Sequence, residues 1–269
     1  MEAKLPKTYS QQLLTGWVNN MIIIKSDNEI NLMRESGKVT GFILKELETF
    51  IKPGMTTMDV DRFVEDTIRK HKMIPTFKGY GGFPASACIS INEEVIHGIP
   101  SSHRIIKNGD LVKVDLGINL NGYFSDSAHG YEIGNVPKNV KQLNKTTKES
   151  LYLAIDAISN SQSPRVSDIG RAVFTHCSER GFGVVKDYCG HGVGLDVHEE
   201  PSIANYINPQ YNARLKEGMV IAIEPMITLG TWKVHTKDDG WTVVTDDNSV
   251  AAHWEHTVAI TENGVEILT

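Results

Sequence analysis

The stretch VKVDLGINLNGYFSDS, residues 112–127, combines a strand pattern with two carboxylates. Its apolar side chains alternate at positions 112, 114, 116, 118 and 120, which is the period of a half-buried strand. Asn121-Gly122 is a strong signal for a two-residue hairpin turn. A hairpin that turns there sets up the pairs Leu120–Tyr123, Gly117–Asp126 and Asp115–Ala128.

Asp115 and Asp126 then lie on one face of the hairpin as diagonal neighbours. Diagonal positions are roughly 7 Å apart at the backbone, so the two carboxylates can converge on an ion between them. Two like charges at that separation repel each other unless a cation joins them. The ordinary alternative is a solvated sheet face, because acidic side chains are mostly exposed. The pair alone does not decide between these interpretations.

Length, composition and charge restrict the class of protein. The chain has 269 residues, of which 40% are hydrophobic and 22% charged, as in a soluble globular protein. This length suits one large α/β or α+β domain with a substantial core. The net charge of -6 argues against broad binding to nucleic acid or to an anionic membrane. It is compatible with an acidic metal site.

The cysteines and the N-terminus point to a compartment. Cys88, Cys177 and Cys189 form an odd, sparse set without CxxC spacing, so neither a disulfide framework nor a thiolate zinc site is indicated. Residues 1–20 lack the apolar region of a signal peptide, and apolar runs such as 219–223 are too short to span a membrane. We therefore expect a cytoplasmic protein without a membrane partner.

Two helices are predicted in the first half. Ser26 and Glu29 have the spacing of a capping box, and Pro53-Gly54 would end the helix that it opens. The side chains expected to be buried on this helix are Ile30, Met33, Phe42, Ile43, Leu44 and Leu47. A second helix is predicted from Thr56 or Thr57 to about Lys70, with Val60, Phe63, Val64 and Ile68 buried.

In the first half the two predicted helices precede the predicted hairpin, and in the second half helices again precede strands. A long helix is predicted over 137–160, and another from Ser167 or Asp168 to Gly181 as its C′ glycine. Strands are predicted around 219–227, 240–245 and 254–261. No Pro- or Ser-rich linker separates the halves. We expect an N-terminal extension over 1–21 and one α+β domain over 22–269.

Polar residues that suit chemistry recur in the second half. The segment YCGHGVGLDVHEEP places His191 and His198 among glycines, which allow a ligand to approach the backbone closely. Glu224 ends the apolar run of MVIAIEPM, and Glu255 interrupts the predicted strand HWEHTVAIT. A carboxylate in an apolar strand is costly unless it is paired or binds a metal. Taken singly, each has an ordinary alternative, such as an ion pair with Lys or Arg, or a turn cap.

Considered together, these residues have the composition of a metal site. Four carboxylates and one imidazole carry a formal charge of about -4, which two divalent cations would balance. Two such ions would hold and deprotonate a water molecule. Oxygen-rich ligation with one nitrogen suits Mn, Fe(II), Co or Zn, and affinity order does not choose among them. The set is Asp115, Asp126, His191, Glu224 and Glu255.

The motifs NEEVIHGIP, VDLGINLNGYFSD, GHGVGLDVHEEP, IEPM and WEHTVAIT occur in an order and spacing that resemble the type I methionine aminopeptidases. The resemblance covers about residues 22–269. It implies an α+β pita-bread fold, in which two pseudo-symmetric halves surround an antiparallel sheet and the site lies between them. The short distance from His191 to Glu224 favours type I over type II. A proline-specific exopeptidase is the nearest rival, and the lack of a domain before residue 22 argues against it.

The resemblance also implies a role for each site residue. The five residues of the metal set would be ligands for two metal ions, and Glu224 would also be the proton acceptor. His198 would contact the scissile carbonyl oxygen, and His97 the nitrogen that follows it. The methionine side chain would lie in a pocket lined by Tyr80, Phe83, Cys88, His97 and Trp241.

The implied function is removal of the N-terminal methionine from nascent proteins and peptides, by metal-activated water, when the second residue is small. The chain's own Met1-Glu2 would then be retained. The resemblance implies a monomer, and the sequence leaves open whether residues 1–20 dock on ribosomes. Leu195-Asp196 and Ser127 depart from the family's usual residues, which puts substrate preference in doubt. The alternative from another class is an inactive peptide-binding module, which would be expected to lose ligands.

Overall fold

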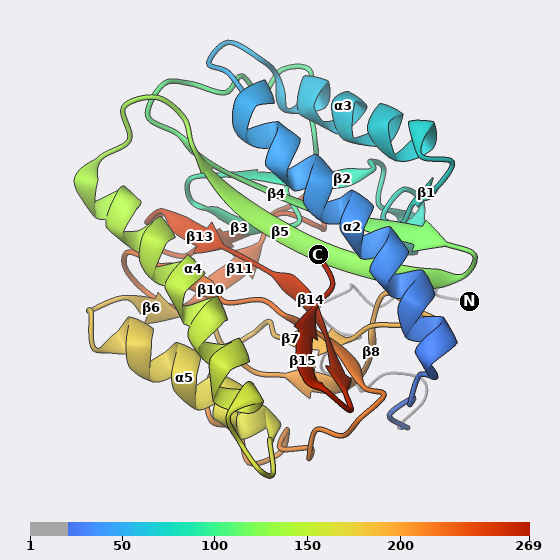
Figure 1. Cartoon of the computed structure of the whole chain (residues 1–269). Helices are drawn as coiled ribbons and strands as arrows, with labels where there is room; N and C mark the ends of the chain where they lie inside the picture. The colour runs from blue at the N-terminus through green and yellow to red at the C-terminus, as the bar shows by residue number, and fades with distance from the viewer. Residues whose placement is uncertain (1–20) are drawn as a thin grey trace, which may run out of the picture.

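The computed structural model describes residues 21–269, so that nearly all of the predicted N-terminal extension lies outside the described residues. Each half contributes a long helix followed by a shorter one (Figure 1). The helices are α2 (Asp27–Phe50), α3 (Thr57–Lys70), α4 (Lys138–Ser159) and α5 (Val166–Ser178). This order confirms the predicted succession of helices in the two halves.

The helices follow the local sequence signals, except for the burial of one side chain and the end of one helix. The capping box of Ser26 and Glu29 is present at the start of α2, as predicted. The prediction that Phe42 is buried is wrong, because its side chain is 46% exposed, with its ring packed edge to face with that of His71. The helix α5 ends at Ser178 with Glu179 as its C-cap, so Gly181 is not the C′ residue. Its positive φ serves the turn that follows.

The hairpin is formed as the alternation and the Asn-Gly turn predict. Strand β4 (Leu111–Leu120) pairs with β5 (Tyr123–Glu132) in antiparallel register. Asn121 and Gly122 both have positive φ, which a tight hairpin turn of this kind requires. The predicted partners are all observed, namely Leu120–Tyr123, Gly117–Asp126 and Asp115–Ala128.

Every strand pairing within residues 21–269 is antiparallel, and the strands form four small sheets. A single turn of 3-10 helix, η1 (Tyr80–Gly82), lies between the first two strands. The remaining strands are β1 (Ile74–Pro75), β2 (Ala87–Ile91), β3 (Glu94–Ile96), β6 (Gly183–Val184), β7 (Gly190–Gly192), β8 (Glu199–Ile203), β9 (Val220–Ile223), β10 (Met226–Thr228), β11 (Val234–Thr236), β12 (Val243–Thr245), β13 (Ala251–His253), β14 (His256–Thr261) and β15 (Gly264–Ile267).

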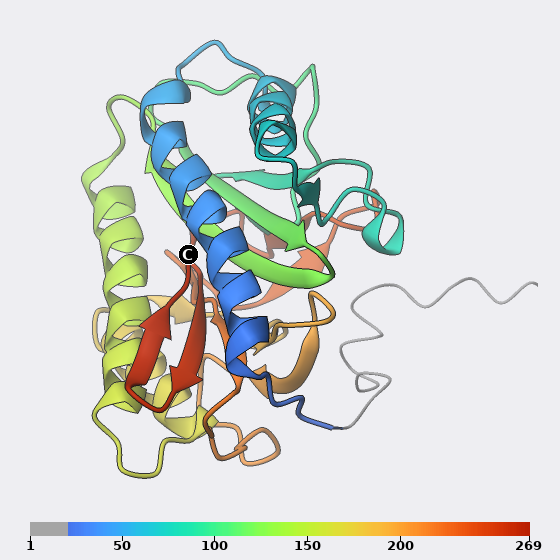
Figure 2. The ribbon, with the colours of Figure 1, turned by 45° about the vertical axis from the view of Figure 1, so that its right-hand side comes forward.

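Each half has its own hydrophobic core. One core is formed by α2 and α3 against β2, β4 and β5, and the other by α4 and α5 against β9, β10, β13 and β14. Both views show the β14–β15 hairpin between α2 and α4 (Figures 1 and 2). An ion pair of 2.6 Å between Arg34 of α2 and Glu266 of β15 joins the halves there. No helix in residues 21–269 is long and apolar enough to cross a membrane.

Candidate metal centre and substrate pocket

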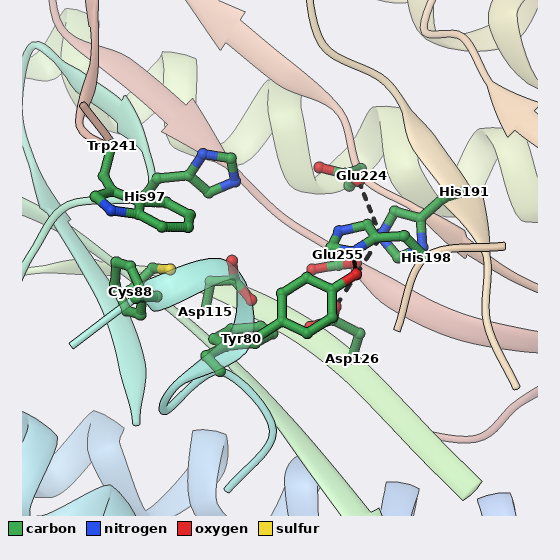
Figure 3. A pocket seen from close by; sticks show the side chains of 12 residues that line it. Tyr80, Cys88, His97, Asp115, Asp126, His191, His198, Glu224, Trp241 and Glu255 are labelled. Atoms are coloured by element: carbon green, nitrogen blue, oxygen red, sulfur yellow. Dashed lines mark hydrogen bonds and ion pairs between the residues drawn. The ribbon is translucent and has the colours of Figure 1, made fainter. Parts of the chain in front are cut away.

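One cavity brings together all the site residues that the sequence predicts (Figure 3). Phe77 also lines this cavity, and sequence reasoning missed it although it lies close before Tyr80. The predicted residues that line the cavity are Tyr80, Phe83, Cys88, His97, Asp115, Asp126, His191, His198, Glu224, Trp241 and Glu255.

Neighbouring antiparallel strands position the five residues of the metal set. The register of the β4–β5 hairpin places Asp115 and Asp126 on one face. His191 is the middle residue of β7 and pairs with Ala222 of β9, at whose end Glu224 follows. The prediction that Glu255 lies within a strand is wrong. It lies in the short break between β13 and β14. There its backbone N–H donates to the carbonyl of Ala128 at 2.8 Å, so its position is still fixed by the sheet.

The acidic groups converge on the imidazole of His191. Its Nε2 lies 3.5 Å from Glu224 Oε1 and 4.0 Å from Asp126 Oδ2. One ligand atom each from Asp126, His191 and Glu255 lie within 4.8 Å of one another. Donor atoms from three separate segments therefore face a common point.

The hydrogen bonding of the carboxylates fits a cation. Among residues 21–269, the buried atoms Asp115 Oδ1 and Asp126 Oδ1 have no hydrogen-bond partner. Within the same residues, no Lys or Arg forms an ion pair with Asp115, Asp126, Glu224 or Glu255. A buried charge is stable only when it is paired or coordinates a metal. The ordinary alternative of ion pairs with Lys or Arg is thus not observed, and this donor set suits divalent cations.

Burial makes the ionised carboxylates unfavourable without a cation. It raises the pKa of both Asp115 and Glu224 to about 7. The pKa values of Asp126 and Glu255 are raised well above their usual range by burial, and further by the neighbouring carboxylates. A bound divalent cation would reverse this electrostatic balance.

Hydrogen bonds between side-chain hydroxyls and the backbone join the two halves and hold Asp126 and Glu255 in place. Thr257 Oγ1 accepts from the Asp126 N–H at 3.0 Å and donates to the Asp126 carbonyl at 2.7 Å. Ser127 Oγ donates to the carbonyl of Glu255 at 2.5 Å. The hydroxyl of Ser127 therefore has a structural role beside the carboxylates, although its side chain does not face the cavity.

The two histidines assigned to the substrate also reach the cavity. His198 Nδ1 lies 3.1 Å from the Tyr80 hydroxyl, and the ring centroids of His198 and His191 are 4.3 Å apart. His97 adopts a φ of 58° and contacts Tyr188 edge-on. Burial lowers the pKa of His97 to about 4 and that of His198 well below its usual value. Both imidazoles are therefore neutral near pH 7, and each offers one donor and one acceptor.

A further histidine near the carboxylates was missed from the sequence. His253 Nε2 lies 3.5 Å from Glu224 Oε2 and is buried. Its signal was present in HWEHTVAIT, where His253 and Glu255 have the i, i+2 spacing that keeps two side chains on one face of an extended chain. His253 therefore belongs to the surroundings of Glu224.

The apolar end of the cavity lies beside the carboxylates. Figure 3 shows Cys88, His97 and Trp241 together at one end, away from His191 and His198 at the other. The rings of Phe83 and Trp241 pack edge to face with centroids 5.2 Å apart. Burial raises the pKa of the Cys88 thiol well above its usual value, so the sulfur is neutral. Aromatic edges and a neutral thiol form a favourable environment for a thioether side chain.

Comparison with known proteins identifies the family of the chain. The sequence pattern of metallopeptidase family M24 matches residues 31–262. The chain belongs to metallopeptidase family M24. It is 51% identical to the methionine aminopeptidase of Clostridium acetobutylicum, with 93% of this chain and 99% of that protein covered. It is 47% identical to methionine aminopeptidase 1 of Bacillus subtilis, at 93% and 99% coverage.

Solved structures of M24 proteins have the same fold. The crystal structure of methionine aminopeptidase from Thermotoga maritima superimposes with a TM-score of 0.88 at 43% identity, and covers 93% of this chain and 99% of that one. The prolidase from Pyrococcus furiosus matches with a TM-score of 0.69 at 25% identity, and this chain spans only 65% of its length. The expected α+β pita-bread fold and the resemblance to methionine aminopeptidases are confirmed.

Proposed function

We propose that this protein is a methionine aminopeptidase, a metal-dependent hydrolase that removes the N-terminal methionine from nascent proteins and peptides whose second residue is small. The observation that carries the proposal is the cavity itself. It places buried carboxylates, which form no ion pair with a Lys or Arg of residues 21–269, beside a pocket lined by aromatic rings and a thiol. The relatives named methionine aminopeptidase, at 51% and 47% identity over nearly their whole length, support the same activity.

The proposed metal ligands are five residues that line the cavity, namely Asp115, Asp126, His191, Glu224 and Glu255. The proposal is supported by the donor atoms of Asp126, His191 and Glu255, which lie within 4.8 Å of one another. Two divalent ions would balance the charge of the whole set, and Mn, Fe(II), Co and Zn are the candidates. Bound divalent cations polarise a carbonyl group and lower the pKa of water toward neutrality.

The chain's own groups would then orient the substrate and transfer protons. Glu224, whose two carboxylate oxygens lie 3.5 Å from the imidazoles of His191 and His253, would accept the proton that the attacking water loses. The neutral imidazole of His198, which approaches the Tyr80 hydroxyl, would donate a hydrogen bond to the carbonyl oxygen as charge develops there. His97 lies at the apolar end and would contact the peptide nitrogen that departs.

The pocket explains why methionine would be selected. Its thioether would pack against Tyr80, Phe83, Trp241 and the Cys88 thiol, and the neutral rings offer no charge to attract a basic side chain. Free cysteines at positions 88, 177 and 189 suit a reducing compartment, and we propose nascent chains in the cytoplasm as substrates. We also propose that the enzyme acts as a monomer.

The test is methionine release from Met-Ala-Ser by metal-stripped protein supplied in turn with Mn, Fe(II), Co and Zn. Release should depend on added metal and vanish in Asp115→Asn, which keeps the size of the side chain but loses its charge. Peptides that begin Xaa-Pro should not be cleaved, and their cleavage would favour a proline-specific exopeptidase. Absence of release with every metal, from folded protein, would instead favour a peptide-binding module.

A further inference from the structure

Lys25 is a buried cation that pairs with Glu199, the residue directly after His198 of the cavity. Lys25 immediately precedes the capping residue of α2, and it is only 4% exposed. Its backbone N–H donates to the carbonyl of Gly218 at 2.7 Å. Its ammonium donates to Glu199 Oε2 at 2.5 Å and to the carbonyl of Ile23 at 3.1 Å. Lys25 is therefore held at both ends, in a pair with a carboxylate that is itself only 6% exposed.

The other oxygen of Glu199 organises the loop that leads to His198. Glu199 Oε1 accepts from the backbone N–H of Leu195 at 2.6 Å and from that of Asp196 at 3.2 Å. Gly194 of this loop packs directly against the Lys25 side chain. The contact leaves no room for a larger residue, since a Cβ at position 194 would lie 2.1 Å from Lys25 Cε. One carboxylate thus joins the buried cation to the backbone of this loop.

The loop in turn determines where His198 lies. His198 directly precedes Glu199, and its neighbour Val197 is buried at 1% exposure in the apolar cluster of the pocket. At the other end of the loop, the Phe124 N–H donates to the Gly194 carbonyl at 3.0 Å and so joins the loop to β5. Movement of Glu199 would therefore shift the His198 imidazole relative to the carboxylates.

We propose that Lys25 is a positioning residue, whose buried ion pair with Glu199 fixes the loop of residues 194–198 and so aims the His198 imidazole at the scissile carbonyl oxygen. The inference rests on the proposed function, because it assigns His198 a role in that reaction. Lys25 does not touch the cavity, and neither Lys25 nor Glu199 belongs to the proposed metal set. Loss of the pair should therefore act on turnover and leave metal binding intact.

Lys25→Met removes the charge and keeps the length of the side chain, and Glu199→Gln removes the opposite charge and keeps an oxygen that can accept from the loop. The matched control is Lys38→Met, which breaks an exposed ion pair on α2 whose side chains are 62% and 59% exposed. For each protein, kcat and KM on Met-Ala-Ser, metal content and melting temperature are measured. We expect kcat to fall about tenfold or more in both test variants, since misplacement of a reacting group by about 1 Å is costly. KM and metal content should stay near the wild-type values, and Lys38→Met should match wild type throughout.

Two results would overturn the inference while the proposed function stands. One is that the wild-type protein is active and both test variants have the same kcat as wild type. The other is a loss of activity that only follows metal content or the folded fraction, because that would mark the pair as structural. If Lys25→Met does not fold, the milder Glu199→Gln decides by the same criteria, and its failure to fold as well would also mark the pair as structural. Absence of methionine release from metal-loaded wild type would contradict the proposed function itself.

Discussion

At the scale of single residues, the buried acidic groups of the cavity destabilise the folded protein when no metal is bound, and the same groups favour the binding of a metal ion. Glu255 is 2% exposed, and burial and three other carboxylates oppose its ionisation. Asp115 and Asp126 each have a buried oxygen that no group in residues 21–269 satisfies. The same electrostatic repulsion that destabilises the metal-free protein is the source of its affinity for divalent cations.

Glu255→Gln should therefore change stability in opposite directions with and without metal. In the metal-free protein at pH 8 we expect the melting temperature to rise by a few degrees, since about 1 kcal/mol corresponds to roughly 2–4 °C at this chain length. With metal present, the variant should bind less metal, melt below wild type and release little methionine. Calorimetry with and without metal measures both effects. Glu262→Gln, an exposed change in the same part of the chain, is the control. A metal-free variant less stable than wild type would contradict this account.

His198→Ala should separate turnover from metal binding. His198 lies 3.1 Å from the Tyr80 hydroxyl and is not one of the five proposed ligands, so metal content should stay at the wild-type value. Loss of one donor to a developing oxyanion lowers kcat by about 10² to 10³. Metal analysis and steady-state kinetics on the same preparation test this, with the exposed His235→Ala as the control. A parallel decline in kcat and metal content would contradict the proposed division of roles.

At the scale of elements, α3 supports the apolar end of the cavity without lining it. Asp61 Oδ1 accepts from the backbone N–H groups of Ser86 and Ala87, each at 2.9 Å, where the chain enters β2. Cys88 of the pocket is the next residue. The helix therefore determines where the lining residue at the start of β2 lies.

Asp61→Ala should weaken recognition of methionine. Two buried N–H donors would lose their acceptor, at a cost of about 1–3 kcal/mol each, and the start of β2 would shift. We expect KM for Met-Ala-Ser to rise several-fold at unchanged metal content, together with a lower melting temperature. Asp66→Ala on the exposed face of the same helix should leave both quantities unchanged. An unaltered KM in folded Asp61→Ala would show that the pocket does not depend on this contact.

At the scale of the whole molecule, the two halves fold around buried ionisable groups, and this makes stability depend on pH. The pKa of Asp115 and Glu224 in the folded, metal-free protein is about 7, above the ordinary values of 3.8 and 4.5. Groups with a raised folded pKa contribute stability at low pH, and this contribution is lost as the pH rises through the folded pKa. Groups with a lowered folded pKa act in the opposite direction, because the unfolded chain binds more protons than the folded one. They are Lys113, with a pKa lowered to about 7, and the buried histidines His97, His129, His191, His198, His253 and His256.

The stabilisation by metal, measured as the melting temperature of the metal-loaded protein minus that of the metal-free protein, should therefore increase between pH 6 and pH 8. Bound cations favour the ionised carboxylates at every pH in this range. Lys113 and the histidines outside the proposed ligand set titrate alike in both forms, so the difference isolates the carboxylates. Thermal unfolding of both forms at three pH values measures it, and a difference that stays constant or shrinks with rising pH would contradict cation binding by these carboxylates.

The sequence by itself determined the local structure and the chemistry of the candidate site. The alternation from Val112 to Leu120 and the Asn121-Gly122 turn determined the hairpin register, because strand period and turn geometry are properties of neighbouring residues. The same local rules placed the capping box of Ser26 and Glu29, and the motifs indicated which acidic and imidazole groups to combine. All of the predicted site residues line one cavity, although their functional roles are still predictions.

Only the tertiary structure decided what depends on contacts between distant segments. In the folded chain Phe42 is exposed, because the apolar face of α2 is wider than the face that is buried. Glu255 lies in a break between two strands. The tertiary structure also brought His253 to Glu224 and Lys25 to Glu199. Periodicity reports which side of an element is buried, but not which residue of another element meets it. That choice follows from packing the two halves together, which no single stretch of the sequence encodes.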